Sequence, residues 1–241
     1  MIKYSPTINP GDVIAVGDIH GRYDLFDNFL ARVKDSQATI ILLGDIIDRG
    51  PDDVKVLERT KQLLDDPESN GLANFFCLMG NHEAMMVDAY EGPSSSLLMW
   101  LQNGGNLEDL QEIHSHVGWV QNLPIYMTLG DTLFIHAGIF PGHDPLKAVE
   151  SGRSDSLLWM REPFLTMGPQ FEKWNPNLKR VVHGHTPYFE DELLGKPNIS
   201  SSGDRIGIDS GAYFTGILTS YNATQNTLWT DYITKPCSIN S

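Results

Sequence analysis

The chain has 241 residues, of which 31 are acidic and 17 are lysine or arginine, and its formal net charge at pH 7 is −14. This charge excludes broad contact with nucleic acid or an anionic membrane surface, because both repel an acidic protein. The sequence contains no apolar run of roughly 18 residues, the length that a membrane-spanning helix needs. A chain of this length can bury one sizeable core, so we expect a single domain over residues 1–241.

The cysteines and the first residues bear on the compartment. The sequence has Cys77 and Cys237, without the close spacing of a redox or zinc motif, and Cys77 lies within an apolar run where packing is its expected role. The first 11 residues hold no apolar segment of the secretory kind. We therefore expect a cytoplasmic, disulfide-free protein, and we expect it to be a monomer.

Three short apolar runs in the first third of the chain each end in a polar cluster. Residues 13–16, 39–43 and 74–79 are rich in β-branched or aromatic side chains, which predicts buried strands. The first two are followed by apolar residues at helical spacing, over 25–33 and 54–64. Strand, loop and helix in this order predict parallel strands with crossover helices, and ligands of such sheets gather at the carboxyl ends of the strands.

Residues 91–122 differ from this pattern and predict a helical insert on the sheet domain. Short helices are expected at 94–101, 107–113 and 116–123, with breaks at Gly92-Pro93 and Asn103-Gly104-Gly105. Trp100 and Trp119 are expected to pack the core of the insert, and His114 and His116 to be exposed polar positions.

The remaining chain predicts further strands. Residues 126–129 and 132–135 flank Gly130-Asp131 as a hairpin, a short helix is expected near 156–161, and 180–182 is a strand. Segments 206–209, 216–221 and 227–232 read as a C-terminal meander. Parallel strands followed by antiparallel ones indicate an α/β (α+β) fold with two sheets packed face to face and helices outside.

Five polar clusters follow apolar runs and together supply oxygen and nitrogen ligands for metal ions. They are Gly17-Asp18-Ile19-His20-Gly21, Gly44-Asp45-Ile46-Ile47-Asp48-Arg49-Gly50, Gly80-Asn81-His82-Glu83, His136-Ala137-Gly138 and His183-Gly184-His185. Individual Gly-Asp pairs also occur as plain turns and helix caps. A mixed oxygen and nitrogen set without thiolate favours manganese, iron or zinc, among which the sequence does not choose.

Two divalent cations need a carboxylate that bridges them and separate terminal ligands. Asp18 and His20 are two residues apart after a strand and can turn toward one ion, while Asp45 is the natural bridge. The other ion is then completed by Asn81, His136 and His185.

Four further residues are assigned to the substrate. His82 directly follows Asn81, so we expect it to face the substrate, and Asp48 is placed to hold its ring as an imidazolium that acts as a general acid. Arg49 and Arg161 are candidates for a clamp on phosphoryl oxygens. For Arg161 the alternative is an ion pair within a helical turn.

These clusters resemble the calcineurin-like metallophosphoesterases, in particular the phosphoprotein phosphatase branch. Its Gly-Asp-x-His-Gly, Gly-Asp-x-x-Asp-Arg-Gly and Gly-Asn-His-Glu blocks stand here unaltered, and the resemblance to bacterial and phage serine/threonine phosphatases extends to Trp159-Met160-Arg161 and Ile208-Asp209-Ser210-Gly211. It implies the four-layer sandwich fold, two divalent ions with Mn²⁺ foremost, and the same ligands, acid pair and arginines. Met79 stands where the phage-type enzymes often have arginine, and His183 where they have an apolar residue, so we interpret His183 as structural or as a neighbour of the ligands.

The resulting hypothesis is a phosphoprotein phosphatase that hydrolyses serine/threonine phosphomonoesters, with tyrosine as a further candidate, by in-line attack of a metal-bound hydroxide. The alternative is a dinucleoside polyphosphate hydrolase, whose bacterial members typically lack the Asp48-Arg49 pair and end the third block with Asp instead of Glu83. A non-catalytic scaffold predicts a missing ligand, and none is missing. The sequence assigns no role to His143 or to the insert.

Overall fold

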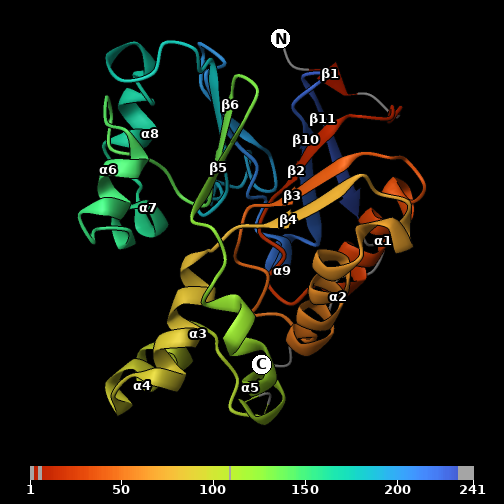
Figure 1. Ribbon diagram of the computed structural model, residues 1–241, viewed down its shortest axis with the longest axis vertical. Coiled ribbons are helices and arrows are strands. Elements are labelled where there is room, and N and C mark those ends of the chain that lie inside the picture. The colour runs from red at the N-terminus through yellow and green to blue at the C-terminus, as the bar shows by residue number, and fades with distance from the viewer. Residues whose placement is uncertain (1–2, 5–6, 109, 233–241) are drawn as a thin grey trace.

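The computed structural model describes residues 3–4, 7–108 and 110–232 of the chain (Figure 1). Its larger sheet has six strands in the order β1-β11-β10-β2-β3-β4. Strands β2, β3 and β4 are parallel, and helices α1 and α2 form the crossovers between them. The bounds are β1 (Lys3–Tyr4), β2 (Val13–Val16), α1 (Tyr23–Val33), β3 (Thr39–Leu42), α2 (Asp53–Asp65), β4 (Asn74–Cys77), β10 (Ile217–Asn222) and β11 (Thr227–Tyr232).

The second sheet has five strands in the order β5-β6-β7-β9-β8. Strands β5 and β6 form the expected antiparallel hairpin, and β6, β7 and β9 are parallel. The bounds are β5 (Tyr126–Leu129), β6 (Thr132–Ile135), β7 (Arg180–His183), β8 (Asn198–Ile199) and β9 (Arg205–Gly207).

The two sheets pack face to face, with helices on both outer faces (Figure 1). Ala15 and Ile41 of the larger sheet share one buried apolar cluster with Phe134 and Val182 of the second sheet. The outer face of the larger sheet buries the apolar sides of α1 and α2. Leu157 belongs to the cluster over the outer face of the second sheet. Each sheet buries apolar side chains on both of its faces, one against the other sheet and one against helices, because burial of apolar area is favourable. The result is four layers, and the expected α/β sandwich is confirmed.

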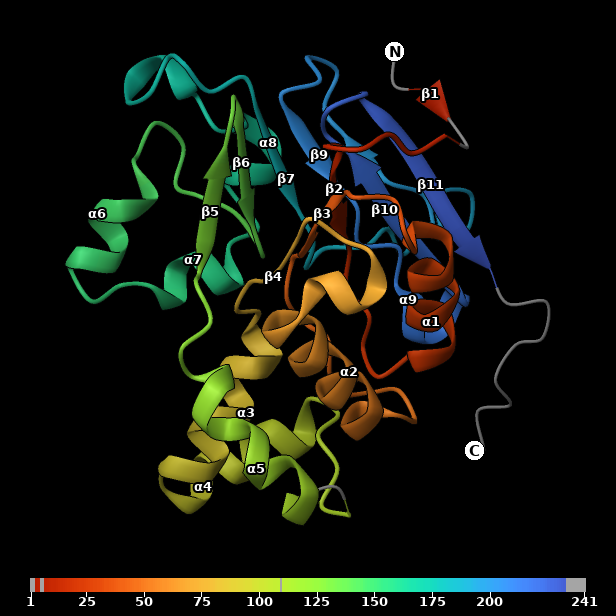
Figure 2. The same ribbon diagram turned by 45° about the vertical axis from the view of Figure 1, so that its right-hand side comes forward.

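The remaining helices surround the sheet ends. Both views show α3, α4 and α5 grouped at one end of the molecule, whereas α6, α7 and α8 lie beside the second sheet (Figures 1 and 2). Their bounds are α3 (Asn81–Glu91), α4 (Ser94–Gln102), α5 (Leu110–Val120), α6 (Pro145–Glu150), α7 (Asp155–Trp159), α8 (Phe164–Met167) and α9 (Ala212–Thr215), with 3₁₀ turns η1 (Pro67–Asn70) and η2 (Phe171–Lys173). Within the described ranges no helix has the length and apolarity to cross a membrane.

Two predicted elements were wrong. The separate helices expected at 107–113 and 116–123 form the single helix α5, because Ile113, Val117 and Val120 continue one buried face across the assumed break. The predicted C-terminal meander is divided between the sheets. Strand β9 pairs with β7 in the second sheet, and the chain then crosses to β10 through α9, which is flanked by Gly211 and Gly216 at φ of +66° and +69°.

Other expectations on single residues can be compared directly with the structure. Cys77 is buried as expected, and Cys237 lies outside the described residues. Trp119 packs against the apolar core, His114 is exposed and His116 is half-buried.

Candidate dinuclear metal centre and active site

The loops at the carboxyl ends of the strands approach one another more closely than side chains would allow. A Cβ atom on Gly44 would lie 2.5 Å from the Gly80 amide nitrogen, and one on Gly184 would lie 2.0 Å from Oδ1 of Asp18. Glycine is therefore required at both positions.

Residues with left-handed backbone geometry are concentrated in these loops. His20, Asp45 and His185 have φ of +47°, +49° and +67°, and Asp48 and Arg49 have φ of +69° and +72°. Such conformations cost on the order of 1 kcal/mol each for residues with a side chain, and they persist only where the surrounding structure enforces them. Their concentration at one place marks a functional site.

The Asp45 carboxylate is the centre of the arrangement. Its Oδ2 lies 3.7 Å from Nε2 of His20 and 3.9 Å from Nε2 of His82, and its Oδ1 lies 3.4 Å from Nε2 of His136. Burial by itself would raise the pKa of Asp45, but His136 and His82 hold this pKa well below its ordinary value. Asp45 is therefore a carboxylate with histidine nitrogens on both of its oxygens, as a bridging ligand requires.

Two groups of side chains place their ligand atoms close enough to hold one cation each. The first is His20, Asp45 and His82, and the second is Asp45, His136 and His185; within each group the atoms lie within 4.8 Å of one another. Oδ1 of Asn81 lies 3.0 Å from Nε2 of His136, beside the second group. The Asp18 carboxylate instead accepts the His185 amide N–H at 3.0 Å, so it meets the second group through the backbone.

The donors fit cations. Nδ1 of His20 donates to the backbone oxygen of Ile47 at 2.9 Å, which leaves its Nε2 lone pair on the side of the cluster. Nδ1 of His136 lies 3.0 Å from the backbone oxygen of Leu43. Burial opposes the charge of this ring, but the neighbouring Asp45 raises the pKa of His136 to about 9, so its Nε2 carries a proton that a cation would replace. Burial lowers the pKa of His20 to about 3 and that of His185 to about 2, so both rings are neutral, as metal binding requires.

Two buried nitrogen atoms need a partner. Among the side chains that the structure describes, Nε2 of His82 and Nε2 of His185 are buried without a hydrogen-bond partner. Buried polar atoms are almost always satisfied, so each of these nitrogens is suited to a ligand, such as a metal ion, water or substrate.

His82 is held by a carboxylate and an indole. Its Nδ1 lies 2.7 Å from Oδ2 of Asp48, and Nε1 of Trp100 donates to Oδ1 of Asp48 at 2.9 Å. Trp100 was expected only to pack the insert, and it also fixes the carboxylate of the predicted acid pair. The insert therefore reaches the site.

The two arginines line one cavity with the metal-binding groups. This cavity has a volume of about 350 Å³ and includes Arg49, Arg161, Asn81 and Asp209 in its wall. Nη1 of Arg49 lies 2.8 Å from Nε2 of His20. The alternative for Arg161, an ion pair with Glu162, is not formed among the described residues, where Glu162 accepts the Thr166 hydroxyl.

Sequence reasoning missed three side chains at the site. Glu83 was used only to separate two branches of the family, but its buried carboxylate accepts hydrogen bonds from the amide N–H groups of Asp45, Ile46 and Gly80 at 2.7, 2.9 and 2.9 Å. Tyr213 supports Arg49, whose guanidinium carbon lies 5.2 Å from the ring centre. The buried Asp209 lines the cavity, and burial raises its pKa to about 6. Glu83 and Asp209 both stood in motifs that carry the family resemblance, whereas Tyr213 had no sequence signal.

His183 lies outside both ligand groups. Its Nδ1 donates to the Gly184 oxygen at 3.0 Å, and its ring contacts Phe164 with the centres 5.1 Å apart. His143 is exposed and lines a different pocket, and Met79 is buried.

A sandwich that gathers histidine, carboxylate and arginine groups at its strand ends defines a metal-dependent hydrolase of phosphate esters. Residues 11–209 match the model of the calcineurin-like phosphoesterase family, and the chain belongs to this family. Its members typically bind two divalent metal ions, and the two groups around Asp45 are suited to such ions.

Relatives with different named activities are similar to this chain. Serine/threonine-protein phosphatase 2 of Escherichia coli strain K12 is 29% identical over 218 residues, which are 86% of this chain and 90% of that protein. The symmetrical bis(5'-nucleosyl)-tetraphosphatase of Acidovorax sp. strain JS42 is 30% identical over 176 residues, which are 68% of this chain and 59% of that protein. A protein serine/threonine phosphatase structure from Saccharomyces cerevisiae has the same fold, with a TM-score of 0.65, 16% identity, and coverage of 98% of this chain and 86% of that one.

Proposed function

We propose that the protein is a phosphoprotein phosphatase that hydrolyses phosphoserine and phosphothreonine with two divalent ions, Mn²⁺ foremost. The observation that carries this proposal is the His82–Asp48 contact of 2.7 Å, with Nε2 of His82 lying 3.9 Å from Oδ2 of Asp45, which lines the cavity together with Arg49. An alkyl phosphate has a poor leaving group, and a positioned general acid is the device that hydrolysis of such an ester needs. The Escherichia coli phosphatase supports the proposal, because its likeness spans 90% of that protein, against 59% for the tetraphosphatase.

The residues divide the work between binding and proton transfer. Arg49 and Arg161 bind the non-bridging phosphoryl oxygens and orient the phosphorus atom. The cations, when bound, supply a nucleophile from water at neutral pH and offset phosphoryl charge. His82 gives the proton on Nε2 to the leaving oxygen as the bond to phosphorus breaks, and Asp48 stabilises the imidazolium before this transfer.

The charge of His82 changes when substrate arrives. Burial lowers the pKa of His82 to about 4, with Asp45 opposing and Arg49 assisting the shift, so the ring is neutral in the free protein. A phosphate dianion held by Arg49 adds negative charge near Nε2 and cancels the effect of the guanidinium, which favours the imidazolium. The acid is thus formed with the substrate in place.

One observation favours a second candidate, a dinucleoside polyphosphate hydrolase. Trp159, Phe189 and Tyr213 line the cavity, and aromatic rings of this kind stack on nucleobases. The Acidovorax relative is a named enzyme of that type.

The two candidates are separated by comparing a phosphoserine peptide with diadenosine tetraphosphate on the Mn²⁺-loaded protein. We expect kcat/KM for the peptide to be higher by at least about tenfold. A higher value for diadenosine tetraphosphate would refute the phosphatase proposal and support the second candidate.

A further inference from the structure

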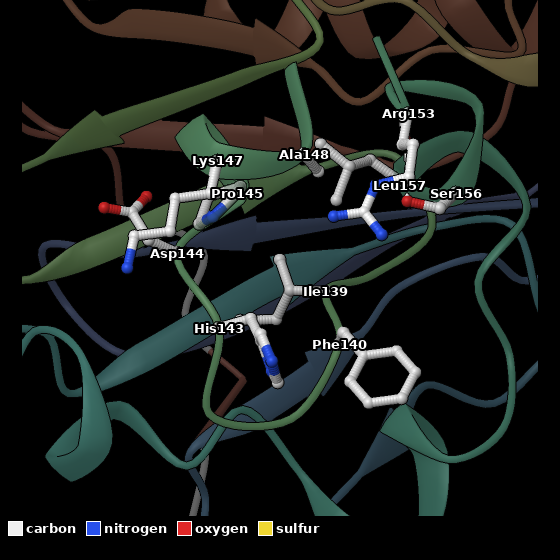
Figure 3. Close-up of a pocket in the computed structure, with 10 residues that line it drawn as sticks. All are labelled: Ile139, Phe140, His143, Asp144, Pro145, Lys147, Ala148, Arg153, Ser156 and Leu157. Carbon is white, nitrogen blue, oxygen red and sulfur yellow. Dashed lines mark hydrogen bonds between the residues drawn. The ribbon is translucent and has the colours of Figure 1, made fainter. Parts of the chain in front are cut away.

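A second pocket lies outside the active-site cavity and shares no lining residue with it. It has a volume of about 270 Å³ and lies between the loop after β6, helix α6 and helix α7 (Figure 3). We call it the α6–α7 pocket. The metal centre and its substrate do not use it.

The floor of the α6–α7 pocket is apolar. Ile139 and Leu157 are buried in its base, and Phe140 forms a wall with 53% of its surface exposed. The ring of His143 stands edge-on to that of Phe140, with their centres 5.2 Å apart. Leu146 on α6 extends the exposed apolar surface beyond the pocket. A pocket with an apolar extension along a helix suits a chain segment with apolar side chains better than a single small molecule.

The rim is cationic in an otherwise acidic protein. Lys147 and Arg153 line the pocket, and in the described part of the chain neither forms an ion pair. Figure 3 shows the Arg153 guanidinium pointing into the pocket above His143 and Ile139. The one lining carboxylate, Asp144, accepts the Leu146 amide at 2.9 Å as the cap of α6. Glu150 and Asp155 on the same helices do not line the pocket, so among its lining residues the two cations outnumber the one carboxylate and favour an anionic partner.

Helix α7 joins the pocket to the active site. Leu157 lines the α6–α7 pocket, whereas Trp159 and Arg161 line the active-site cavity. On the other side, Ile139 comes only three residues after the metal-site residue His136. The two cavities are thus connected along both segments of the chain.

We propose that the α6–α7 pocket is a docking site for a segment of the protein substrate that alternates acidic and large apolar residues, away from its phosphorylated residue. The proposal rests on the phosphoprotein phosphatase function proposed above. The apolar side chains lie on Ile139 and Leu157, and the carboxylates face Lys147 and Arg153. The site adds affinity for whole substrates without taking part in the reaction.

The first test measures binding without turnover. The probe is a labelled, unphosphorylated peptide that alternates glutamate with leucine and phenylalanine, followed by fluorescence anisotropy. We expect the double variant Lys147→Glu/Arg153→Glu to bind it at least about tenfold more weakly than wild type. The control Lys34→Glu/Lys61→Glu changes the net charge equally on the α1 and α2 side, and we expect it to bind as wild type does. Equal weakening by both variants, or no binding by wild type, would overturn the proposal.

The second test fills the pocket without changing its charge. Ala148→Trp places a large ring among the lining residues. We expect a severalfold higher KM for a phosphopeptide that carries the acidic and apolar flank, an unchanged KM for the same peptide without the flank, and unchanged turnover of p-nitrophenyl phosphate. Unchanged KM values for both peptides would count against the docking site.

Further outcomes separate this proposal from its alternatives and from the proposed function. Stabilisation of wild type by benzoate or inorganic phosphate, lost in Lys147→Glu/Arg153→Glu and accompanied by no peptide binding, would replace the docking site with a small-anion site. Binding of the probe by a protein that cleaves only diadenosine tetraphosphate would refute the phosphatase function and keep the pocket as a peptide site. Phosphopeptide turnover by a wild type that does not bind the probe would refute the docking site alone.

Discussion

Nδ1 of His82 lies 2.7 Å from Oδ2 of Asp48, and this contact sets the direction of the ring. Since Nδ1 is engaged, only Nε2 is free to face the metal-binding groups, where it lies 3.9 Å from Oδ2 of Asp45. Trp100 donates to the other Asp48 oxygen at 2.9 Å and prevents the carboxylate from rotating away. A residue of the insert therefore fixes a proton donor at the strand ends.

The acid assignment predicts different losses for different leaving groups. His82→Asn removes the proton donor, so we expect turnover of phosphoserine peptides to fall by about 10²–10⁴-fold. Aryl phosphates leave without protonation, and p-nitrophenyl phosphate turnover should fall far less. Steady-state kcat values for both substrates give the comparison, and equal losses would contradict the assignment.

Glu83 is predicted to support the site through the backbone. Glu83→Gln keeps the shape of the side chain but replaces one carboxylate oxygen with an NH₂ group. This NH₂ group cannot accept the hydrogen bonds that the backbone N–H groups now donate to Glu83. Burial raises the pKa of Glu83 to about 7, while these amides favour its charged form. We expect a loss of about 3 kcal/mol in the free energy of unfolding, since hydrogen bonds to buried charge are lost.

Urea unfolding of the metal-free protein gives this quantity. The control is Glu91→Gln at the exposed end of the same helix, which should change the free energy by less than about 0.5 kcal/mol. A Glu83→Gln variant as stable as this control would show that the three hydrogen bonds contribute little.

Tyr213 is predicted to position Arg49. The guanidinium lies 5.2 Å from the ring centre, a contact worth about 1 kcal/mol, so we expect Tyr213→Ala to lower kcat/KM about fivefold. Tyr213→Phe keeps the ring and should retain nearly full activity. In an Arg49→Ala background the Tyr213→Ala change should have no further effect on kcat/KM, and a full additive loss there would exclude this coupling.

The positions of the strand ends could be predicted from the sequence, whereas several contacts there could not. Asp18, Asp45 and Asn81 each follow an apolar run with a crossover, and parallel strands necessarily bring such residues to one edge. The structure gathers them with His136 and His185, and their roles as ligands stay predictions.

The missed contacts depend on packing between distant segments. The indole of Trp100 reaches Asp48 across 52 residues of chain, and Tyr213 approaches Arg49 from α9. Composition and periodicity report whether a side chain is buried but not which partner it meets. The same limit explains why β9 was assigned to the wrong sheet, because its pairing with β7 is non-local.

Helix α5 is predicted to be sensitive to acid through His116. Nε1 of Trp119 donates to Nδ1 of His116 at 3.0 Å, which requires an unprotonated nitrogen, and burial lowers the pKa of this ring. The folded state thus disfavours protonation of His116. The stabilisation of the folded state by this hydrogen bond is therefore complete above the unfolded pKa of about 6.5, and it is lost as the pH falls below that value.

Tryptophan fluorescence measures this change. We expect the difference in tryptophan fluorescence between wild type and Trp119→Phe to be constant from neutral pH upward. At lower pH this difference should titrate with a midpoint below the unfolded pKa. His116→Gln keeps an acceptor without titrating and should abolish the transition. A midpoint at or above the ordinary histidine value would contradict the prediction.

Counting bound Mn²⁺ per chain tests most directly whether Asp45 bridges two cations. Elemental analysis after equilibrium dialysis should find two ions in wild type, one in His185→Ala and fewer than one in Asp45→Asn, because loss of the bridge weakens both sites. Hydrolysis of p-nitrophenyl phosphate should follow the same order. Wild-type protein that hydrolyses this substrate while binding no metal, or Asp45→Asn protein that still binds two ions, would contradict the account.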